Sequence, residues 1–470
     1  MEALLALAPI VTVVVLLLLR VAAVWAATAG FAVAVALASA VFTLTPPEAA
    51  EAALGTAPIL GEVALILLGG VTLAESMARS GAQDRIAAWL AALEERAGRA
   101  PMLLLLVYGL TPFTESVTGF ALGVVITAPL LLRLGLTPVR AVTTGLLGLV
   151  LVPWGSLAPG TLVASELGGV GFAQLGFWTA VFTLPVLMAS GVGVLLIAFS
   201  RPTLRQILLT AAVLLLQWGA LLGVSALLAP PLAGVLASAV VIVSVLLGVR
   251  LRSGALPAVP KPLRAALMPY AVLVSGILLS SGLISVTGQQ SLALLSSPGL
   301  WVVLAGAISV RQLRGAAQRR QAAAATLRRW LPIAATTLLF MLLGFTMAAT
   351  GMAEVLATAA AAMGPAFVGL IPLVGALGGF LTGSNTGAAA MFSAATSAAA
   401  SGLGANPLVA LAGQNAAGSF AMIASPPRIA LAAGVVLAAG ERPPSAVGRI
   451  LLVTVLAAAV VIGGLTLTLA

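Results

Sequence analysis

Long apolar segments separated by short polar connections run along the whole chain. Each segment is close to the roughly 20 residues that a helix needs to cross about 30 Å of hydrocarbon. The segments lack the alternation of a barrel strand, and only helices or closed barrels satisfy backbone groups in lipid. The pattern predicts an all-α polytopic membrane protein. The expected spans cover residues 4–19, 22–43, 57–77, 101–132, 141–163, 173–199, 206–229, 232–249, 266–283, 299–310, 330–350, 365–402, 406–440 and 446–469.

Two of these segments are interrupted near their middle. Segments 101–132 and 365–402 each carry a tract of Gly, Ser and Thr between apolar stretches. We interpret each as a broken or re-entrant helical hairpin. The chain then divides into N-terminal spans at 1–56, a first repeat at 57–200 with the first hairpin, connecting spans with a basic cytoplasmic loop at 201–329, and a second repeat at 330–470 with the second hairpin.

Composition and charge agree with this class. Hydrophobic residues make up 61% of the chain and charged residues 7%, against about 25% charged in soluble domains. The net charge of +10 comes from short clusters between apolar runs, so it indicates membrane topology rather than nucleic-acid binding. The clusters at 79–99, 201–205, 250–264 and 311–329 are expected on the cytoplasmic side of the cell inner membrane, the last one near lipid headgroups. The connections near Glu48, Glu166 and Gly288 are expected on the other side.

Short tracts of the first half recur in the second half in the same order. The charge pattern also places the entrances of the two hairpins on opposite sides of the membrane. Together these features predict an inverted repeat, a common plan of secondary transporters in which substrate binds between discontinuous helices. The matched tracts are LLG at 67–69 and 342–344, ESVTG at 115–119 with GSNTG at 383–387, and GSLAP at 155–159 with GSFAM at 418–422.

Glu115 is an acidic residue inside the first hairpin. An ionised carboxylate in hydrocarbon costs at least a few kcal/mol, so this group is expected to be protonated, paired or beside water. Such a carboxyl suits the uptake and release of a proton during transport. The alternative is a structural carboxyl that holds the hairpin together. We expect Glu115 to couple transport to the proton.

The polar tracts of both hairpins supply the expected substrate contacts. Glycine lets the backbone break, and Ser, Thr and Asn offer donors beside the free N–H groups of a helix start. A helix N-terminus attracts a carboxylate, so two facing helix starts at the hairpin tips would clamp an anion. The alternative is that small residues only permit close helix packing. The expected contacts are Thr114, Ser116, Thr118, Gly119, Ser384, Asn385, Thr386 and Gly387.

Two further elements broken by Gly and Pro follow the hairpins, VPWGSLAPGT at 152–161 and GQNAAGSFAMIASPPR at 413–428. Irregular backbone at membrane depth is tolerated where it lines a cavity or is buried in protein. Asn415, Ser425 and Arg428 of the second element join the expected site. The guanidinium of Arg428 matches a carboxylate in bidentate geometry. Alternatively, this arginine extends to the cytoplasmic surface.

These motifs resemble the L-lactate permease family of bacterial membrane transporters. Glu115 fills the place of the family's Glu before its first Gly-Phe, whereas Asn385 replaces an acid and Met422 falls on the family's lysine position. The resemblance implies a symporter that takes up lactate, or a glycolate-like 2-hydroxy monocarboxylate, with a proton. It rests on ESMARSGAQDRIAAWL at 75–90, TESVTGFALGVVITAPLLLRLGLTPVRA at 114–141, the VPWGSLAPG element, GALGGFLTGSNTGAAAMF at 375–392 and SPPRIALA at 425–432.

Two alternatives remain. A sodium-coupled carboxylate transporter of related hairpin architecture would hold Na⁺ with oxygen ligands at the hairpin tips, and the tract at 384–386 resembles the tips of dicarboxylate transporters. An intramembrane enzyme is the more distant alternative, because the chain has no His or Cys and no Asp in an expected span. The expected partners are a small carboxylate, a proton and membrane lipid, without nucleic acid, cofactor or metal.

Overall fold

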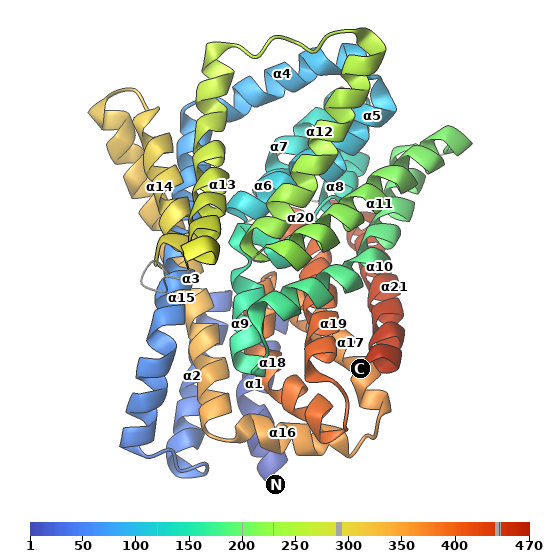
Figure 1. The fold of residues 1–470 in the computed structure, drawn as a ribbon. Coiled ribbons are helices and arrows are strands. Elements are labelled where there is room, and N and C mark those ends of the chain that lie inside the picture. The colour runs from blue at the N-terminus through green and yellow to red at the C-terminus, as the bar shows by residue number, and fades with distance from the viewer. Residues whose placement is uncertain (120, 200, 229, 288–293, 438–440, 442) are drawn as a thin grey trace.

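The computed structural model describes residues 1–470 except 120, 200, 229, 288–293, 438–440 and 442. The described chain is helical, and ten of its helices are long and apolar enough to cross a membrane. The predicted all-α polytopic class is therefore confirmed. The helices run mostly up and down the molecule (Figure 1). Buried Leu, Val and Ala side chains fill the space between them. The predicted connection near Gly288 lies outside the described residues.

The helices follow one another through short connections. The first part contains α1 (Glu2–Leu18), α2 (Ala23–Ala40), α3 (Pro46–Arg79), α4 (Ala82–Ala97), α5 (Arg99–Leu104), the π-helix η1 (Leu105–Leu110), α6 (Thr111–Thr118), α7 (Leu122–Arg133), α8 (Pro138–Leu147), η2 (Val152–Leu157), α9 (Pro159–Gly168) and α10 (Phe172–Ala198). The second part contains α11 (Leu204–Leu227), η3 (Pro230–Leu232), α12 (Ala233–Ser253), α13 (Lys261–Thr287), α14 (Pro298–Arg311), α15 (Gly315–Ala349), α16 (Met352–Ala361), α17 (Ala366–Thr382), α18 (Asn385–Gly402), α19 (Pro407–Ala421), η5 (Met422–Ala424), α20 (Pro426–Gly434) and α21 (Ser445–Leu469). Each predicted broken segment is a hairpin of helices.

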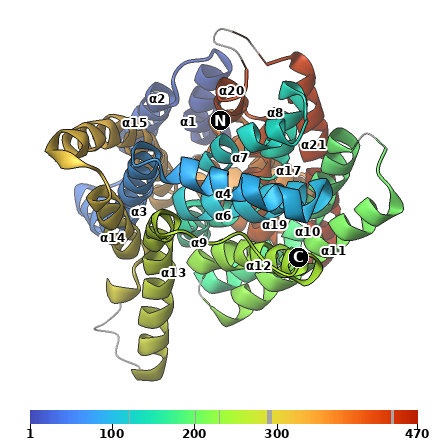
Figure 2. The same cartoon turned by 90° about the horizontal axis from the view of Figure 1, so that it is seen from above.

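Three of the basic segments meet at one end of the molecule. Figure 2, seen from above, shows α4 lying across this end. Arg96 of α4 donates a hydrogen bond to the carbonyl of Ala255 at 3.0 Å, and Gln318 donates one to the carbonyl of Arg79 at 3.2 Å. The grouping agrees with one shared side for the clusters at 79–99, 250–264 and 311–329.

The basic segment before residue 330 is mostly helix rather than the expected loop. α15 begins at Gly315, because the Ala, Arg, Gln and Leu residues that follow are strong helix formers. The expected domain boundary after residue 329 therefore falls inside α15, and the boundary after residue 56 falls inside α3. Both long helices run from the basic or N-terminal segments directly into the core.

The two halves of the chain repeat the same order of elements. α3 and α15 are each followed by a short helix, a hairpin, an interrupted helix and a long helix. The packing is reciprocal: α2 packs on α15 while α14 packs on α3, and α1 packs on α16 while α13 packs on α4. In Figure 1, α4 and the first hairpin lie in the upper half, whereas α16 and the second hairpin lie in the lower half. The arrangement agrees with an inverted repeat, which stays a prediction.

The two matched hairpin tracts lie at different points of their hairpins. ESVTG at 115–119 forms the last turn of α6 and ends at Gly119, whose φ is 69°. GSNTG at 383–387 starts at Gly383, whose φ is 62°, and continues into α18. Glycine adopts these left-handed conformations at little cost. The shared letters therefore mark the end of one helix and the start of another, and they do not align one tip with the other.

Candidate functional site

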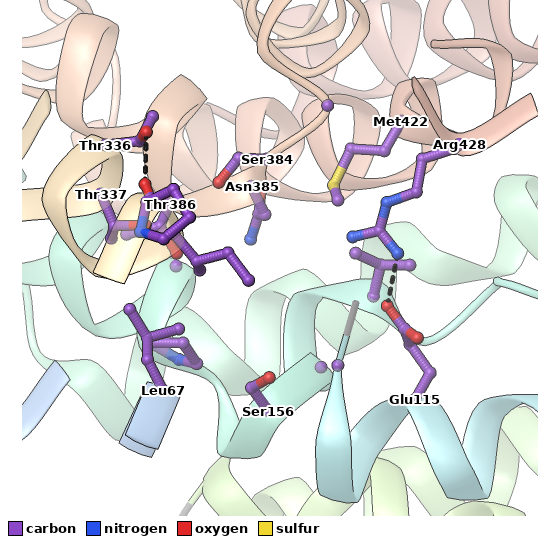
Figure 3. A pocket seen from close by; sticks show the side chains of 18 residues that line it. Leu67, Glu115, Ser156, Thr336, Thr337, Ser384, Asn385, Thr386, Met422 and Arg428 are labelled. Atoms are coloured by element: carbon purple, nitrogen blue, oxygen red, sulfur yellow. Dashed lines mark hydrogen bonds and ion pairs between the residues drawn. The ribbon is translucent and has the colours of Figure 1, made fainter. Parts of the chain in front are cut away.

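Both hairpin tips border one cavity of about 350 Å³, a volume within the usual range of small-molecule sites (Figure 3). Its walls come from both halves of the chain. The first half contributes Leu67, Glu115, Gly119, Val152, Gly155, Ser156, Pro159 and Gly160. The second half contributes Pro332, Ile333, Thr336, Thr337, Gly383, Ser384, Asn385, Thr386, Met422 and Arg428.

An ion pair between the halves forms one wall of this cavity. Nη1 of Arg428 donates to Oε1 of Glu115 at 3.0 Å, and the two side chains are 13% and 2% exposed. The other carboxylate oxygen of Glu115 is buried without a hydrogen-bond partner in the described chain. Figure 3 shows the guanidinium pointing into the cavity, so Arg428 does not extend to the surface.

The start of α20 positions Arg428. Ser425 has an extended backbone before Pro426 and Pro427, and proline at the first helical position suits a helix start. Arg428 then lies in the first turn and faces Glu115 in the last turn of α6. Met422 in η5 borders the same cavity. Met422 and Arg428 therefore share one space.

The starts of α18 and α9 border the cavity, and of these two only the start of α18 belongs to a hairpin tip. At α18, the Ser384 hydroxyl accepts the N–H of Gly387 at 3.2 Å, and Asn385 and Thr386 border the cavity. The second start is that of α9, where Pro159 and Gly160 border the cavity. The expectation of one helix start from each hairpin is therefore corrected, because the first tract ends α6 instead of starting α7.

Three residues predicted in the first hairpin point away from the cavity. The hydroxyls of Thr114 and Thr118 donate to carbonyls one turn earlier, at 2.8 Å and 2.6 Å. Ser116 lies against Gly234 of α12. Side chains on a helix project in different directions at each residue, so a helix that turns Glu115 to the cavity turns its neighbours elsewhere. Of this tract, Glu115 and Gly119 reach the cavity.

The remaining predicted residues do not border the cavity but make hydrogen bonds within or behind its walls. Oδ1 of Asn415 accepts from Asn385 at 2.9 Å, and its Nδ2 donates to the hydroxyls of Thr161 and Thr179 at 3.0 Å and 3.2 Å. Asn415 therefore joins the tip of the second hairpin to α9 and α10. The hydroxyl of Ser425 donates to the carbonyl of Met422 at 2.7 Å. The N–H group of Gly387 donates to the Ser384 hydroxyl, which caps the start of α18.

Sequence reasoning missed the contribution of α15. Thr336 and Thr337 border the cavity, and Figure 3 shows them on the side opposite the ion pair. The Thr336 hydroxyl donates to the carbonyl of Pro332 at 2.7 Å. A threonine hydroxyl inside a helix commonly donates to the carbonyl one turn earlier, so this bond is local to α15. The available signal was two polar residues shortly after a proline in an apolar span.

Fold and site together define a class: a multi-pass membrane protein whose two halves meet at a buried acid–arginine pair, as in transporters. A sequence model of the L-lactate permease family matches residues 2–253 and 265–469, and the chain belongs to this family. The family is one of membrane transporters of lactate and not of enzymes. No curated protein matches the chain at a significant level.

Proposed function

We propose that the protein is a secondary active transporter that carries a lactate-type 2-hydroxy monocarboxylate together with a proton across the cytoplasmic membrane. The observation that supports this most strongly is the buried Glu115–Arg428 pair in a cavity that both hairpin tips border. The alternatives of a sodium-coupled symporter and of a purely structural pair predict different behaviour in the experiments below.

The charges in the cavity account for proton coupling. Glu115 and Arg428 balance each other when the cavity is empty. A bound monocarboxylate adds one negative charge, and an uncompensated charge in a largely apolar site is costly. Protonation of Glu115 removes that excess and frees the Arg428 donor that held it. Anion and proton therefore bind together, because either one alone leaves a net charge in the cavity.

The substrate carboxylate binds between Arg428 and the start of α18. A guanidinium carries five N–H donors, and the contact with Glu115 uses one of its terminal nitrogens. The free N–H groups of the first turn of α18 add a partial positive charge on the facing wall. The hydroxyls of Ser384 and Thr386 suit the 2-hydroxyl group of the substrate.

Movement of one half against the other exposes the cavity to each side in turn. The reciprocal packing of α2 on α15 and of α14 on α3 supports an inverted repeat, and the repeat supports two equivalent states with opposite access. Because Glu115 and Arg428 lie on different halves, the pair tightens or loosens as the halves move. The proton thus acts at the contact between the moving parts.

Uptake of labelled lactate into proteoliposomes tests this proposal. The pH gradient and the sodium gradient are imposed independently, with choline replacing sodium. We expect accumulation when the outside is acidic, without any requirement for sodium. A requirement for sodium would replace proton coupling by the sodium-coupled alternative, and a lack of lactate uptake under every gradient would exclude lactate as the substrate.

Glu115→Gln separates proton coupling from substrate binding. The amide keeps the shape of the side chain but cannot gain or lose the proton. We expect loss of accumulation driven by a pH gradient, with exchange of internal for external lactate retained. Glu354→Gln is the matched control, because Glu354 is exposed on α16. Normal accumulation by the Glu115 variant would assign this carboxyl to structure.

A further inference from the structure

A second polar cavity lies at the basic end of the molecule and shares no lining residue with the Glu115–Arg428 cavity. Its volume is about 510 Å³. Arg79, Arg85 and Arg314 border it together with Gln312 and Gln318, and its described lining includes no acidic residue. We call it the basic cavity. The transport proposed for the Glu115–Arg428 cavity does not involve the basic cavity.

Three helices begin at the basic cavity. α4 starts after Ser80 and Gly81, α15 starts after Arg314, and neither start has a side-chain cap. α13 contributes Pro262 and Ala265 from its first turns. The starts of α4 and α15 carry a partial positive charge on free N–H groups, which is the arrangement that attracts anions.

The arginines of the basic cavity carry more positive charge than their surroundings neutralise. Arg79 uses its Nε to contact Glu75 at 2.7 Å, and Glu75 also contacts Arg329 at 2.8 Å, so one carboxylate serves two arginines. The Nε of Arg85 is buried without a hydrogen-bond partner in the described chain. Asp84, in the same turn, is exposed and does not border the cavity.

The wall around these charges is held in place by hydrogen bonds. Gln318 accepts the N–H of Arg314 at 2.6 Å and donates to the carbonyl of Arg79 at 3.2 Å. Gln312 donates to the carbonyl of Ala265 at 2.7 Å. These bonds tie the ends of α3, α13, α14 and α15 together. The site is therefore built before any ligand arrives, which reduces the cost of binding.

We propose that the basic cavity binds a phosphate-bearing anion, either the headgroup of an anionic phospholipid or a free phosphate. Arginine forks and free helix N–H groups are the donors that match phosphate oxygens. A bound phosphate joins α3 and α4 to α15. Since α3 and α15 also border the transport cavity, the ligand holds together the ends of two helices that face the substrate.

Calorimetric titration of the purified protein in a neutral detergent tests the proposal. Inorganic phosphate is one probe, with chloride at equal ionic strength as its reference. Short-chain phosphatidylglycerol is the other, with short-chain phosphatidylcholine as its reference. Arg85→Gln with Arg314→Gln should weaken binding by about tenfold or more, because two charge-assisted contacts are lost. Arg201→Gln with Arg205→Gln removes the same charge from exposed positions outside the cavity and should leave binding unchanged.

The outcomes separate the two sources of phosphate. Binding of inorganic phosphate identifies a free anion, and binding of phosphatidylglycerol alone identifies a lipid headgroup. Binding of neither probe, or equal weakening by both pairs of substitutions, would overturn the proposal. If the first pair does not fold, Arg314→Gln alone replaces it, since Arg314 is exposed. Unchanged binding by that variant would also overturn the proposal.

Discussion

The two hairpins border the same cavity but contribute different chemistry. In the first hairpin, Glu115 lies in the last turn of α6, just before the break at Gly119. In the second, the break at Gly383 comes first, and Ser384 and Asn385 begin a new helix at the cavity. One hairpin therefore presents a carboxylate at a helix end, and the other presents neutral donors at a helix start.

In the proposed function, this difference assigns proton handling to the first hairpin and anion binding to the second. The C-terminal end of a helix carries a partial negative charge, which adds to the negative charge of the Glu115 carboxylate. Either Arg428 or a proton must compensate, which is the property that a coupling group needs. The helix start of the second hairpin carries the opposite partial charge and attracts the substrate carboxylate.

Removal of the arginine should have the largest effect. Arg428→Gln leaves Glu115 buried without its partner, which costs about 3–5 kcal/mol of stability, and abolishes lactate uptake. Arg428→Lys keeps the charge but loses the planar fork, so it should raise the apparent KM for lactate. Glu115→Gln combined with Arg428→Gln should recover most of the stability but no transport. Full stability of Arg428→Gln alone, measured by thermal unfolding in detergent, would contradict this account of the pair.

The two hairpin breaks should respond differently to alanine. At Gly119, a Cβ atom would collide with Ser156, and the φ of 69° with ψ of −160° suits only glycine, so Gly119→Ala should cost about 2–4 kcal/mol. At Gly383, the nearest atom to a Cβ is the Ser425 hydroxyl at 3.3 Å, so Gly383→Ala should cost about 1–2 kcal/mol.

Thermal unfolding and transport rates measure both glycine variants. Ser156 has a φ of 51°, so Ser156→Gly is compatible with its backbone and removes the collision. Adding it to Gly119→Ala should recover part of the lost stability. Equal loss of stability from alanine at Gly119 and at Gly383 would mean that both positions require glycine to the same extent.

Loss of Asn415 should disturb the second hairpin without touching substrate. Asn415→Ala leaves the Asn385 amide without its acceptor, at a cost of about 1–3 kcal/mol, and should raise the KM for lactate more than it lowers the maximal rate. Gln414→Ala is the control, because Gln414 contacts Ser393 and Thr396, which do not border the transport cavity. An equal KM change in both variants would make Asn415 a general packing residue.

The smallest effects come from single hydroxyls. Ser384→Ala removes the cap of α18, which is worth about 1 kcal/mol, and should raise the KM modestly because the helix start borders the cavity. Thr118→Val removes a hydroxyl that contacts only backbone carbonyls, so uptake of labelled lactate should be unchanged. A larger transport defect for the Thr118 variant would show that hairpin side chains outside the cavity take part in the cycle.

Much of the architecture was predictable because the relevant signals are local. Apolar run lengths located the spans and both hairpins, and basic clusters located one end of the molecule. Six expected site residues border the cavity: Glu115, Gly119, Ser384, Asn385, Thr386 and Arg428. The helical nature of 315–329 was missed, because a charged segment between spans was taken for a loop although its residues favour helix.

The motif match misled where direction mattered. ESVTG and GSNTG share letters, yet the first ends a helix and the second starts one. A short sequence match carries no information about whether a glycine breaks the chain before or after the polar residues. The second helix start at the cavity, that of α9, was recognisable as a broken element but not as the partner of α18.

Sequence by itself determined that this protein lies in a membrane, which of its helices are broken, and which polar and charged residues lie in the apolar segments. Hydrocarbon favours helices in a chain without barrel alternation, and it tolerates only rare, compensated polar groups, so this constraint acts residue by residue along the chain. Tertiary structure decided the pairing of Glu115 with Arg428, which are 313 positions apart, and the face that each hairpin turns to the cavity. Electrostatic compensation depends on distance in space, and only the packing of the two halves against each other sets that distance.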